Sequence, residues 1–155
     1  MGRPLRGSGW STVPLTYQYS CKATELGVRD LAIRLLDALT VECICEDQKN
    51  SIGIAVIEGL NNIVEHALSG CSNERIYVDL SLNSAQVFIL LQDKGRAMPG
   101  WQIPAGRPAY LPVARPDLPE GGFGWTLIHT LADRVDYSRI NGVNRLKMWF
   151  PSHPK

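Results

Sequence analysis

Hydrophobic and polar positions follow two different periods along this chain. Alternation with a period of two, typical of half-buried strands, occurs at residues 13–19, 75–82, 86–92, 134–140 and 144–150. Apolar residues recur at helical spacing at residues 25–39, at residues 47–68 and from about residue 124 onward. The expected order is strand, helix, helix, two strands, an irregular segment, helix and two strands. It predicts an α+β fold, a two-layer sandwich whose mostly antiparallel, mixed sheet carries helices on one face.

Capping and turn residues set the limits of these elements. Thr24 is suited to cap the first helix, and Pro14 favours an edge position for the first strand. Residues 83–85 and the pair Asn141-Gly142 predict two hairpin turns.

The length of 155 residues fits a single domain with one core. We expect this domain at residues 13–150, between a flexible N-terminus at 1–12 and a C-terminal tail at 151–155. Residues 95–120 are rich in proline and have no sustained period, which favours a functional lid. In the third helix, the side chains expected to point inward are those of Leu127, Ile128 and Leu131.

Composition excludes several classes of protein. The formal net charge is +1 and no long basic run occurs, so we expect no nucleic-acid binding. No apolar run approaches the roughly 20 residues that a membrane-spanning helix needs, and no secretory h-region follows the basic N-terminus. We therefore expect a cytoplasmic protein. The spacing of the four cysteines supports neither zinc nor disulfides, which predicts reduced, half-buried structural thiols.

The second helix has a polar face at Glu58, Asn62 and His66, spaced four residues apart. Such a row of polar side chains, or polar ridge, can lie along a bound triphosphate. The amide oxygen of Asn62 suits Mg²⁺, and Glu58 could orient or deprotonate a nucleophile. The alternative is an ordinary solvent-facing side of an amphipathic helix. His66 is not proposed as a base, because a histidine near a helix end often serves backbone hydrogen bonding. The opposite, packing face comprises Ile52, Val56, Gly59, Leu60, Ile63 and Ala67.

Two further segments carry candidate chemistry. Asp93 ends a predicted strand, where its carboxylate can accept a hydrogen bond from a purine amine, and Gly95 would let the ring approach the backbone. An ordinary turn is the alternative. Gly121, Gly122 and Gly124 precede the third helix, where free N–H groups and the helix dipole favour phosphate. A flexible hinge is equally compatible with these glycines, and the Walker A pattern is absent.

These three segments, in this order, resemble the N, G1 and G2 boxes of the GHKL ATPase superfamily, shared by gyrase B, heat-shock chaperones and histidine kinases. The resemblance extends over about residues 13–150. Within the superfamily, the helix around Glu58, Asn62 and His66 and the segment 120–124 are similar to those of bacterial anti-sigma factor serine kinases.

The resemblance implies a Bergerat-type ATP pocket with Glu58 as candidate general base and Asn62 as Mg²⁺ ligand. Asp93 would contact adenine, and the glycines would lie along the phosphates. Two residues depart from the family pattern: Ala97 is the third small position of the G1 box, and Trp125 replaces the usual leucine. The residues assigned to nucleotide binding are Asn62, His66, Asp93, Gly95, Ala97, Gly121, Gly122, Phe123, Gly124 and Trp125.

The function that the resemblance implies is an ATP-binding serine/threonine-protein kinase with ATP and Mg²⁺ as cofactors. Such kinases bind a sigma factor and phosphorylate a serine on a STAS-type anti-sigma antagonist, and many are homodimers. Arg107 or Arg115 in the lid could reach the γ-phosphate, although solvated loop arginines are the alternative. A nucleotide-dependent sequestering module with little phosphate transfer stays open. A histidine kinase catalytic domain is disfavoured, because the chain has no room for a phosphoacceptor helix.

Overall fold

The computed structural model describes residues 13–106 and 123–153. Within these ranges the elements follow the predicted order, with two short helical turns added. The elements are β1 (Leu15–Lys22), α1 (Glu25–Val41), α2 (Glu46–Asn62), the π-helical turn η1 (Ile63–Ala67), β2 (Arg75–Leu82), β3 (Gln86–Asp93), the 3-10 turn η2 (Pro99–Trp101), α3 (Phe123–Leu131), β4 (Arg134–Ile140) and β5 (Val143–Pro151).

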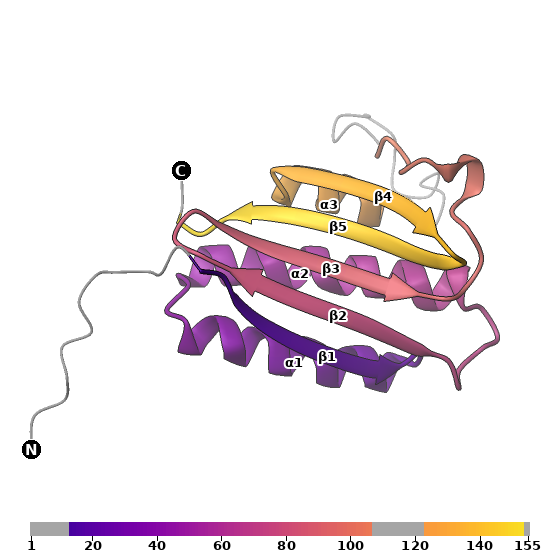
Figure 1. Cartoon of the computed structure of the whole chain (residues 1–155), viewed down its shortest axis with the longest axis horizontal. Helices are drawn as coiled ribbons and strands as arrows, with labels where there is room; N and C mark the ends of the chain where they lie inside the picture. Colours follow the sequence, from indigo (N-terminus) through magenta and orange to yellow (C-terminus); the bar gives the residue numbers. More distant parts are fainter. Residues whose placement is uncertain (1–12, 107–122, 154–155) are drawn as a thin grey trace, which may run out of the picture.

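The five strands form one sheet in the order β1-β2-β3-β5-β4. All four pairings are antiparallel, so the predicted antiparallel sheet is confirmed but the described strands contain no parallel pair that would make it mixed. The three α-helices lie on one face of the sheet (Figure 1). The predicted two-layer α+β architecture is therefore confirmed.

Several local sequence signals act as expected. The Thr24 hydroxyl caps α1 by accepting a hydrogen bond from Gly27 N at 3.0 Å. β1 lies at an edge of the sheet, with Pro14 just before its first residue. Asn141 and Gly142 have φ values of 51° and 78°, which suit the tight turn between the right-handed twisted strands β4 and β5.

Helix α2 is the central element of the helical layer, because it contacts α1, α3, β3 and β5. Its packing side is buried as predicted: Ile52, Val56 and Leu60 are at most 1% exposed. Gly59 allows close approach to the sheet, since a Cβ there would lie 2.8 Å from Leu91 Cδ1. This contact holds the C-terminal half of α2 against the centre of the sheet.

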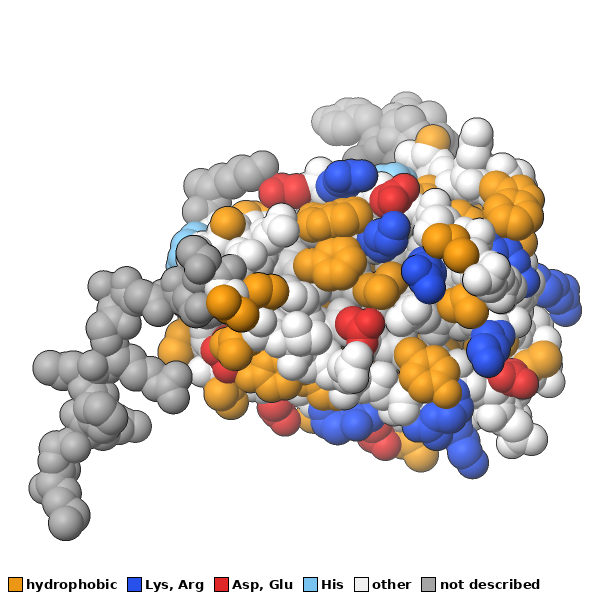
Figure 2. Space-filling model, viewed as in Figure 1, with side chains coloured by type: hydrophobic (Ala, Val, Ile, Leu, Met, Phe, Trp, Pro, Cys, Tyr) orange, Lys and Arg blue, Asp and Glu red, His pale blue; other side chains and the backbone are white. Residues whose placement is uncertain are grey.

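The other face of the sheet is not covered by any helix that the structure describes. The rings of Phe88 and Trp149 pack there with centroids 5.1 Å apart, and the Arg134 guanidinium lies 4.6 Å from the centre of the Trp149 ring. Lys147 forms an ion pair with Asp136 at 3.5 Å. Figure 2 shows this face, on which hydrophobic and charged side chains are interspersed.

The second helix differs from the prediction at its C-terminal end. Residues 47–68 were expected to form one α-helix, but α2 ends at Asn62 and continues as η1, where Leu68 N donates to Ile63 O at 2.8 Å. The wider turn occurs where the segment after β3 meets the helix, and Arg96 N donates to Ala67 O at 2.8 Å. A long-range backbone contact therefore accompanies the departure from α-helical spacing.

Two smaller expectations were wrong in part. In α3, Ile128 is buried and Leu131 packs against the core as expected, but Leu127 is 39% exposed, and Trp125, one turn before Ile128, points inward instead. Of the free cysteines only Cys21 is buried; Cys43, Cys45 and Cys71 are exposed rather than half-buried, because they lie in or beside connections at the ends of helices.

The expected tail is partly structured. Pro151 belongs to β5, and Ser152 is buried because its hydroxyl donates to Ser84 O at 2.6 Å. Of the predicted lid at 95–120, residues 95–106 are described and carry η2. Its remaining residues, including Arg107 and Arg115, lie outside the described part of the chain.

The contact between Gly95 and Ala67 yields a prediction. A Cβ at position 95 would lie 2.3 Å from Ala67 O and 2.5 Å from Ala67 C, and backbone atoms cannot move aside cheaply. We expect Gly95→Ala to lower the free energy of unfolding by about 3 kcal/mol or more, measured by urea denaturation.

The matched control is Gly70→Ala. A Cβ at Gly70 meets nothing within 4 Å, so this variant should lose only the roughly 1–2 kcal/mol of a left-handed alanine at φ 77°. Equal losses in both variants would show that the contact with Ala67 is not required.

Candidate functional site

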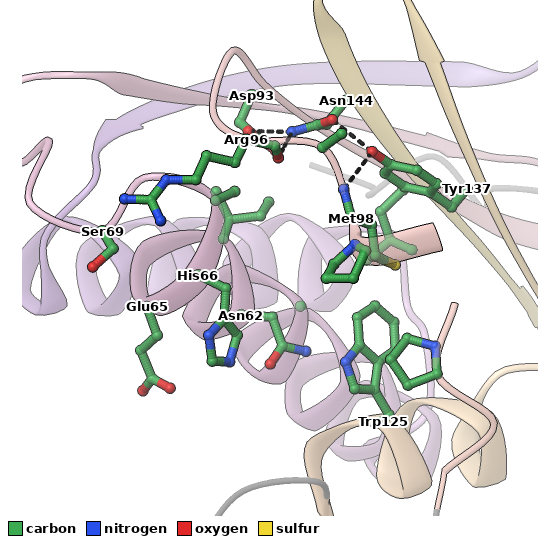
Figure 3. Close-up of a pocket in the computed structure, with 17 residues that line it drawn as sticks. Asn62, Glu65, His66, Ser69, Asp93, Arg96, Met98, Trp125, Tyr137 and Asn144 are labelled. Atoms are coloured by element: carbon green, nitrogen blue, oxygen red, sulfur yellow. Dashed lines mark hydrogen bonds between the residues drawn. The ribbon is translucent and has the colours of Figure 1, made fainter. Parts of the chain in front are cut away.

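A cavity of about 520 Å³ opens between the helices and the end of the sheet, within the size range of small-molecule sites. Its walls come from the end of α2 and η1, the segment after β3, the first turn of α3, and strands β4 and β5 (Figure 3). The predicted site residues that line this cavity are Asn62, His66, Asp93, Ala97 and Trp125.

Asp93 lies at one end of the cavity and is only 3% exposed. Its Oδ1 accepts hydrogen bonds from Gly95 N at 2.7 Å and from Asn144 Nδ2 at 2.8 Å. Burial raises the pKa of this carboxyl above its usual value, while the bonds from Asn144 and Gly95 and the charge of Arg139 oppose the rise. Oδ2 receives no hydrogen bond from the described residues, so it can accept one from a ligand amine.

Asn144 holds Asp93 in place with all of its hydrogen-bonding groups. Its Nδ2 donates to Asp93 Oδ1 and, at 2.8 Å, to Arg96 O. Its Oδ1 accepts from Tyr137 OH and from Arg139 Nη1, both at 2.6 Å. One buried amide thus joins the end of β3, the following segment and strand β4 (Figure 3).

The same network fixes the segment after β3. Arg139 Nη1 also donates to Gly95 O at 2.8 Å, and Met98 N donates to Tyr137 OH at 3.0 Å. Gly95 itself does not line the cavity; the structure gives its lack of a side chain another reason, the close approach to Ala67.

Glu58 does not line the cavity. It is half-buried at the contact between α2 and α3, where a Cβ on Gly124 would lie 2.6 Å from Glu58 Oε2. The glycine at position 124 therefore leaves room for this carboxylate at the beginning of α3. Phe123 is 46% exposed, and Gly121 and Gly122 lie outside the described residues.

Asn62 is one turn of helix further along and faces the cavity. Its Nδ2 is buried and has no hydrogen-bond partner in the described structure, whereas Oδ1 is not among the enclosed atoms. No group of three or more His, Cys, Asp or Glu among the described residues could hold a metal ion alone. The residues nevertheless fit Mg²⁺, which takes one or two protein oxygens and completes its octahedron with water and phosphate.

His66 is exposed and lies in η1, so the π-helical turn changes its spacing from Asn62 relative to the predicted ridge. It still lines the cavity, and so does the neighbouring Glu65. The polar ridge is therefore only partly reproduced: Asn62 and His66 face the cavity, while Glu58 lies at its border.

The residues that position Asp93 were missed by the sequence analysis. A signal for Asn144 existed, because the alternation of β5 places it on the buried face with Leu146, Met148 and Phe150. It is the only polar residue in that series. Its partnership with Asp93 required the register of β5 against β3, in which Asp93 faces Asn144. The bonds of Tyr137 and Met98 had no local signal.

Comparison with known proteins identifies the family. A model of the histidine kinase-like ATPase domain matches residues 21–150. The chain belongs to this family. The expected membership of the GHKL-type ATPases is thereby confirmed.

Two relatives of this histidine kinase-like ATPase domain are similar over part of their length. The anti-sigma F factor of Clostridium beijerinckii is 31% identical over 98 residues, which cover 62% of this chain and 66% of that protein. The serine-protein kinase RsbW of Halalkalibacterium halodurans is 32% identical over 101 residues, covering 63% and 59%. The chain thus spans less than two-thirds of the length of each relative.

Solved structures support the fold. The RsbU and RsbW domains of a Mycobacterium tuberculosis protein align with a TM-score of 0.61 and 18% identity, over 90% of this chain and 32% of that one. A chain of the SiaB-SiaC complex from Pseudomonas aeruginosa aligns with a TM-score of 0.56 and 11% identity, over 87% of this chain and 89% of that one.

Among the described residues, no helix combines the length and apolar character needed to cross a membrane.

The hydrogen bonds of Asn144 predict the effect of an almost isosteric change. Asn144→Asp replaces the donor facing Asp93 Oδ1 and Arg96 O by an acceptor. We expect a loss of roughly 3 kcal/mol in the free energy of unfolding at pH 7.5, since two buried carboxylates then oppose each other. The loss should shrink at pH 5, where one proton can be shared.

Urea denaturation at both pH values measures this effect. Asn73→Asp, at an exposed position, is the control and should change stability little at either pH. A pH-independent loss in Asn144→Asp would contradict the assigned contact with Asp93.

Proposed function

We propose that the cavity binds ATP with Mg²⁺ and that the chain is a serine/threonine-protein kinase of the anti-sigma type. The observation that carries this proposal is Asp93: a buried, positioned carboxylate with Oδ2 available at one end of a cavity, in a chain of the histidine kinase-like ATPase family. Such a carboxylate selects adenine, because adenine presents an exocyclic amine where guanine presents an acceptor.

The remaining groups have separate roles in this proposal. Asn62 Oδ1 would hold Mg²⁺, which neutralises charge on the phosphates when bound. His66 and Ala97 line the wall of the nucleotide site. Gly121, Gly122 and Gly124, with Phe123, would lie along the phosphates before and at the beginning of α3, where the helix dipole favours anions.

Glu58 would act as general base toward the hydroxyl of a protein serine. Its position at the junction of α2 and α3, beside Gly124, supports this role, because the phosphates are assigned to the beginning of α3. A serine oxygen entering there would lose its proton to Glu58 as it attacks the γ-phosphorus in line, and the bond to the bridging oxygen would break to release ADP.

The names of the relatives support the choice of partners. One is an anti-sigma F factor and the other a serine-protein kinase. We infer that this chain binds a sigma factor and phosphorylates a serine of a STAS-type antagonist in the cytoplasm, and that it forms a homodimer.

A second candidate function is a sequestering module that binds nucleotide and a regulator with little phosphate transfer. It is favoured by one observation, that Glu58 lies outside the lining of the cavity. Binding and transfer are therefore tested separately.

The binding prediction uses thermal unfolding. At a hundredfold excess over Kd, Mg-ATP should raise Tm by about 5–10 °C, since a ligand that binds only the folded state stabilises by roughly 2.7 kcal/mol. Asn62→Ala should remove most of this rise, as should EDTA in the wild-type protein.

The control for the binding prediction is Asn61→Ala, which changes the same residue type on α2 outside the cavity lining and should keep the full rise. An undiminished rise in Asn62→Ala would contradict the metal role. No rise in the wild-type protein would contradict nucleotide binding.

The transfer prediction uses labelled ATP and a cognate STAS protein. Glu58→Gln should reduce phosphorylation of the acceptor serine by about a hundredfold or more while leaving the Mg-ATP shift in Tm intact, because an amide cannot accept the proton. Glu74→Gln, at an exposed position outside the cavity lining, should transfer at the wild-type rate. Nucleotide binding without transfer in the wild-type protein would favour the sequestering module.

A further inference from the structure

The outer face of the sheet, which no helix among the described residues covers, carries more cationic than acidic side chains. The strand register sets which residues point outward, because their neighbours along each strand face the helices. The outward acidic residues are Asp79 and Asp136. The outward cationic residues are Lys22, Arg75, Arg134, Arg145 and Lys147. The whole chain has a formal net charge of only +1, so positive charge is concentrated on this face.

Arg145 lies on β5, with Gln92 of β3 on one side and Ser138 of β4 on the other. Its Nε is enclosed and has no hydrogen-bond partner, and the same is true of Ser138 Oγ. The guanidinium forms no ion pair with any acidic residue that the structure describes. Because part of the group is shielded from water, its charge is less well solvated than that of a fully exposed arginine. An incoming carboxylate is therefore attracted more strongly.

The neighbouring cations on this face are already engaged. Lys147 pairs with Asp136, and the Arg134 guanidinium lies over the Trp149 ring. Arg145 differs because its terminal nitrogens are neither enclosed nor bonded within the described part of the chain, so they can receive a carboxylate end-on. Its half-buried side chain is already held in place, so little conformational freedom is lost when an anion binds.

A hollow of about 310 Å³ lies next to Arg145 on the same face. Its lining includes Gln92, the register partner of Arg145, and Val143, two residues before Arg145 on β5. Lys94 also lines the hollow and is exposed, and it has no ion pair inside the described ranges. Two cations without a counter-charge therefore flank a depression that can receive acidic side chains.

The occupant that fits this surface is an acidic protein segment. A second copy of the chain would bring like charges together, which is unfavourable. Single-stranded nucleic acid binds by stacking bases on free aromatic rings, but among the outward residues of the described strands only the ring of Tyr77 is exposed. Asp79, which lines the hollow from β2, would repel a phosphate chain, whereas a peptide N–H can donate to it.

We propose that the outer face binds an acidic segment of a partner protein, with one carboxylate on Arg145 and another on Lys94. Figure 2 shows this face, where basic side chains reach its middle. The face lies on the opposite side of the sheet from the helices, so this partner binds without entering the nucleotide cavity. The inference does not depend on the proposed function.

The experiment measures binding of a labelled peptide, in which glutamate alternates with threonine, to the full chain by fluorescence anisotropy. Arg145→Gln should weaken binding by about tenfold or more, because a hydrogen bond between two charged groups is lost. The matched control is Arg29→Gln, which removes the same charge from an exposed position of α1 and should keep the affinity within about twofold.

A second measurement needs no substitution. In ¹H–¹⁵N NMR spectra of the wild-type protein, the peptide should shift the amide signals of Gln92, Lys94 and Arg145 and leave those of α1 in place. The same peptide with glutamine in place of each glutamate should shift none of them, since the contact depends on carboxylates.

Three results would overturn the inference. Equal weakening in Arg145→Gln and Arg29→Gln would show that net charge alone attracts the peptide. Tighter binding of a single-stranded oligothymidylate of the same charge would indicate a nucleic-acid surface, and unshifted signals on the outer face would exclude the docking site.

The outcomes are also separate from those of the proposed function. Wild-type protein that binds this peptide but no nucleotide would support the docking surface and contradict the proposed function, and nucleotide binding without peptide binding would do the reverse.

Discussion

The buried amide of Asn144 is the interaction on which the candidate site depends. Its four hydrogen bonds fix Asp93 at the end of β3, the carbonyl of Arg96 beyond it, and two side chains of β4. A buried amide with one partner missing would lose more than the energy of one bond, because the remaining groups lie away from water. The orientation of Asp93 is therefore set by the packing of the sheet, before any ligand is present.

Glycines determine how closely the surrounding segments approach one another. Gly59 brings α2 against the sheet, Gly95 brings the segment after β3 against the carbonyl of Ala67, and Gly124 leaves room for the Glu58 carboxylate. The three positions differ in what a methyl group would disturb. At Gly95 it would meet backbone, whereas at Gly59 and Gly124 it would meet the mobile end of a side chain. Only the contact at Gly95 is therefore fixed by the main chain itself.

Local patterns predicted most of the fold. The strands β2, β3, β4 and β5, the cap at Thr24 and the turn at Asn141 depend on neighbours in sequence, so periodicity and residue type were sufficient. The π-helical turn was not predictable in this way, because it accompanies a contact between Ala67 and Arg96.

In the candidate site, too, local sequence signals were predictable and long-range contacts were not. Asn62, Asp93 and Ala97 were found because their motifs are contiguous in sequence and resemble a known family. Asn144 was missed because its role arises from the strand register that pairs it with Asp93, 51 positions away. Tyr137 was missed because its role depends on Asn144 and on Met98 N, which is 39 positions away. Glu58 was expected on a ridge with Asn62, but the packing of α3 against α2 places it at the border of the cavity.

The strand order 1-2-3-5-4 divides the sheet into two continuous segments of chain, β1-β2-β3 and β4-β5, which meet along a single strand pair. The cavity lies at one end of this seam and takes its walls from both segments. An occupant that touches Asp93 and Trp125 together would act as a cross-link between them, so its departure would loosen the docking of the C-terminal hairpin and α3 onto the remainder of the molecule.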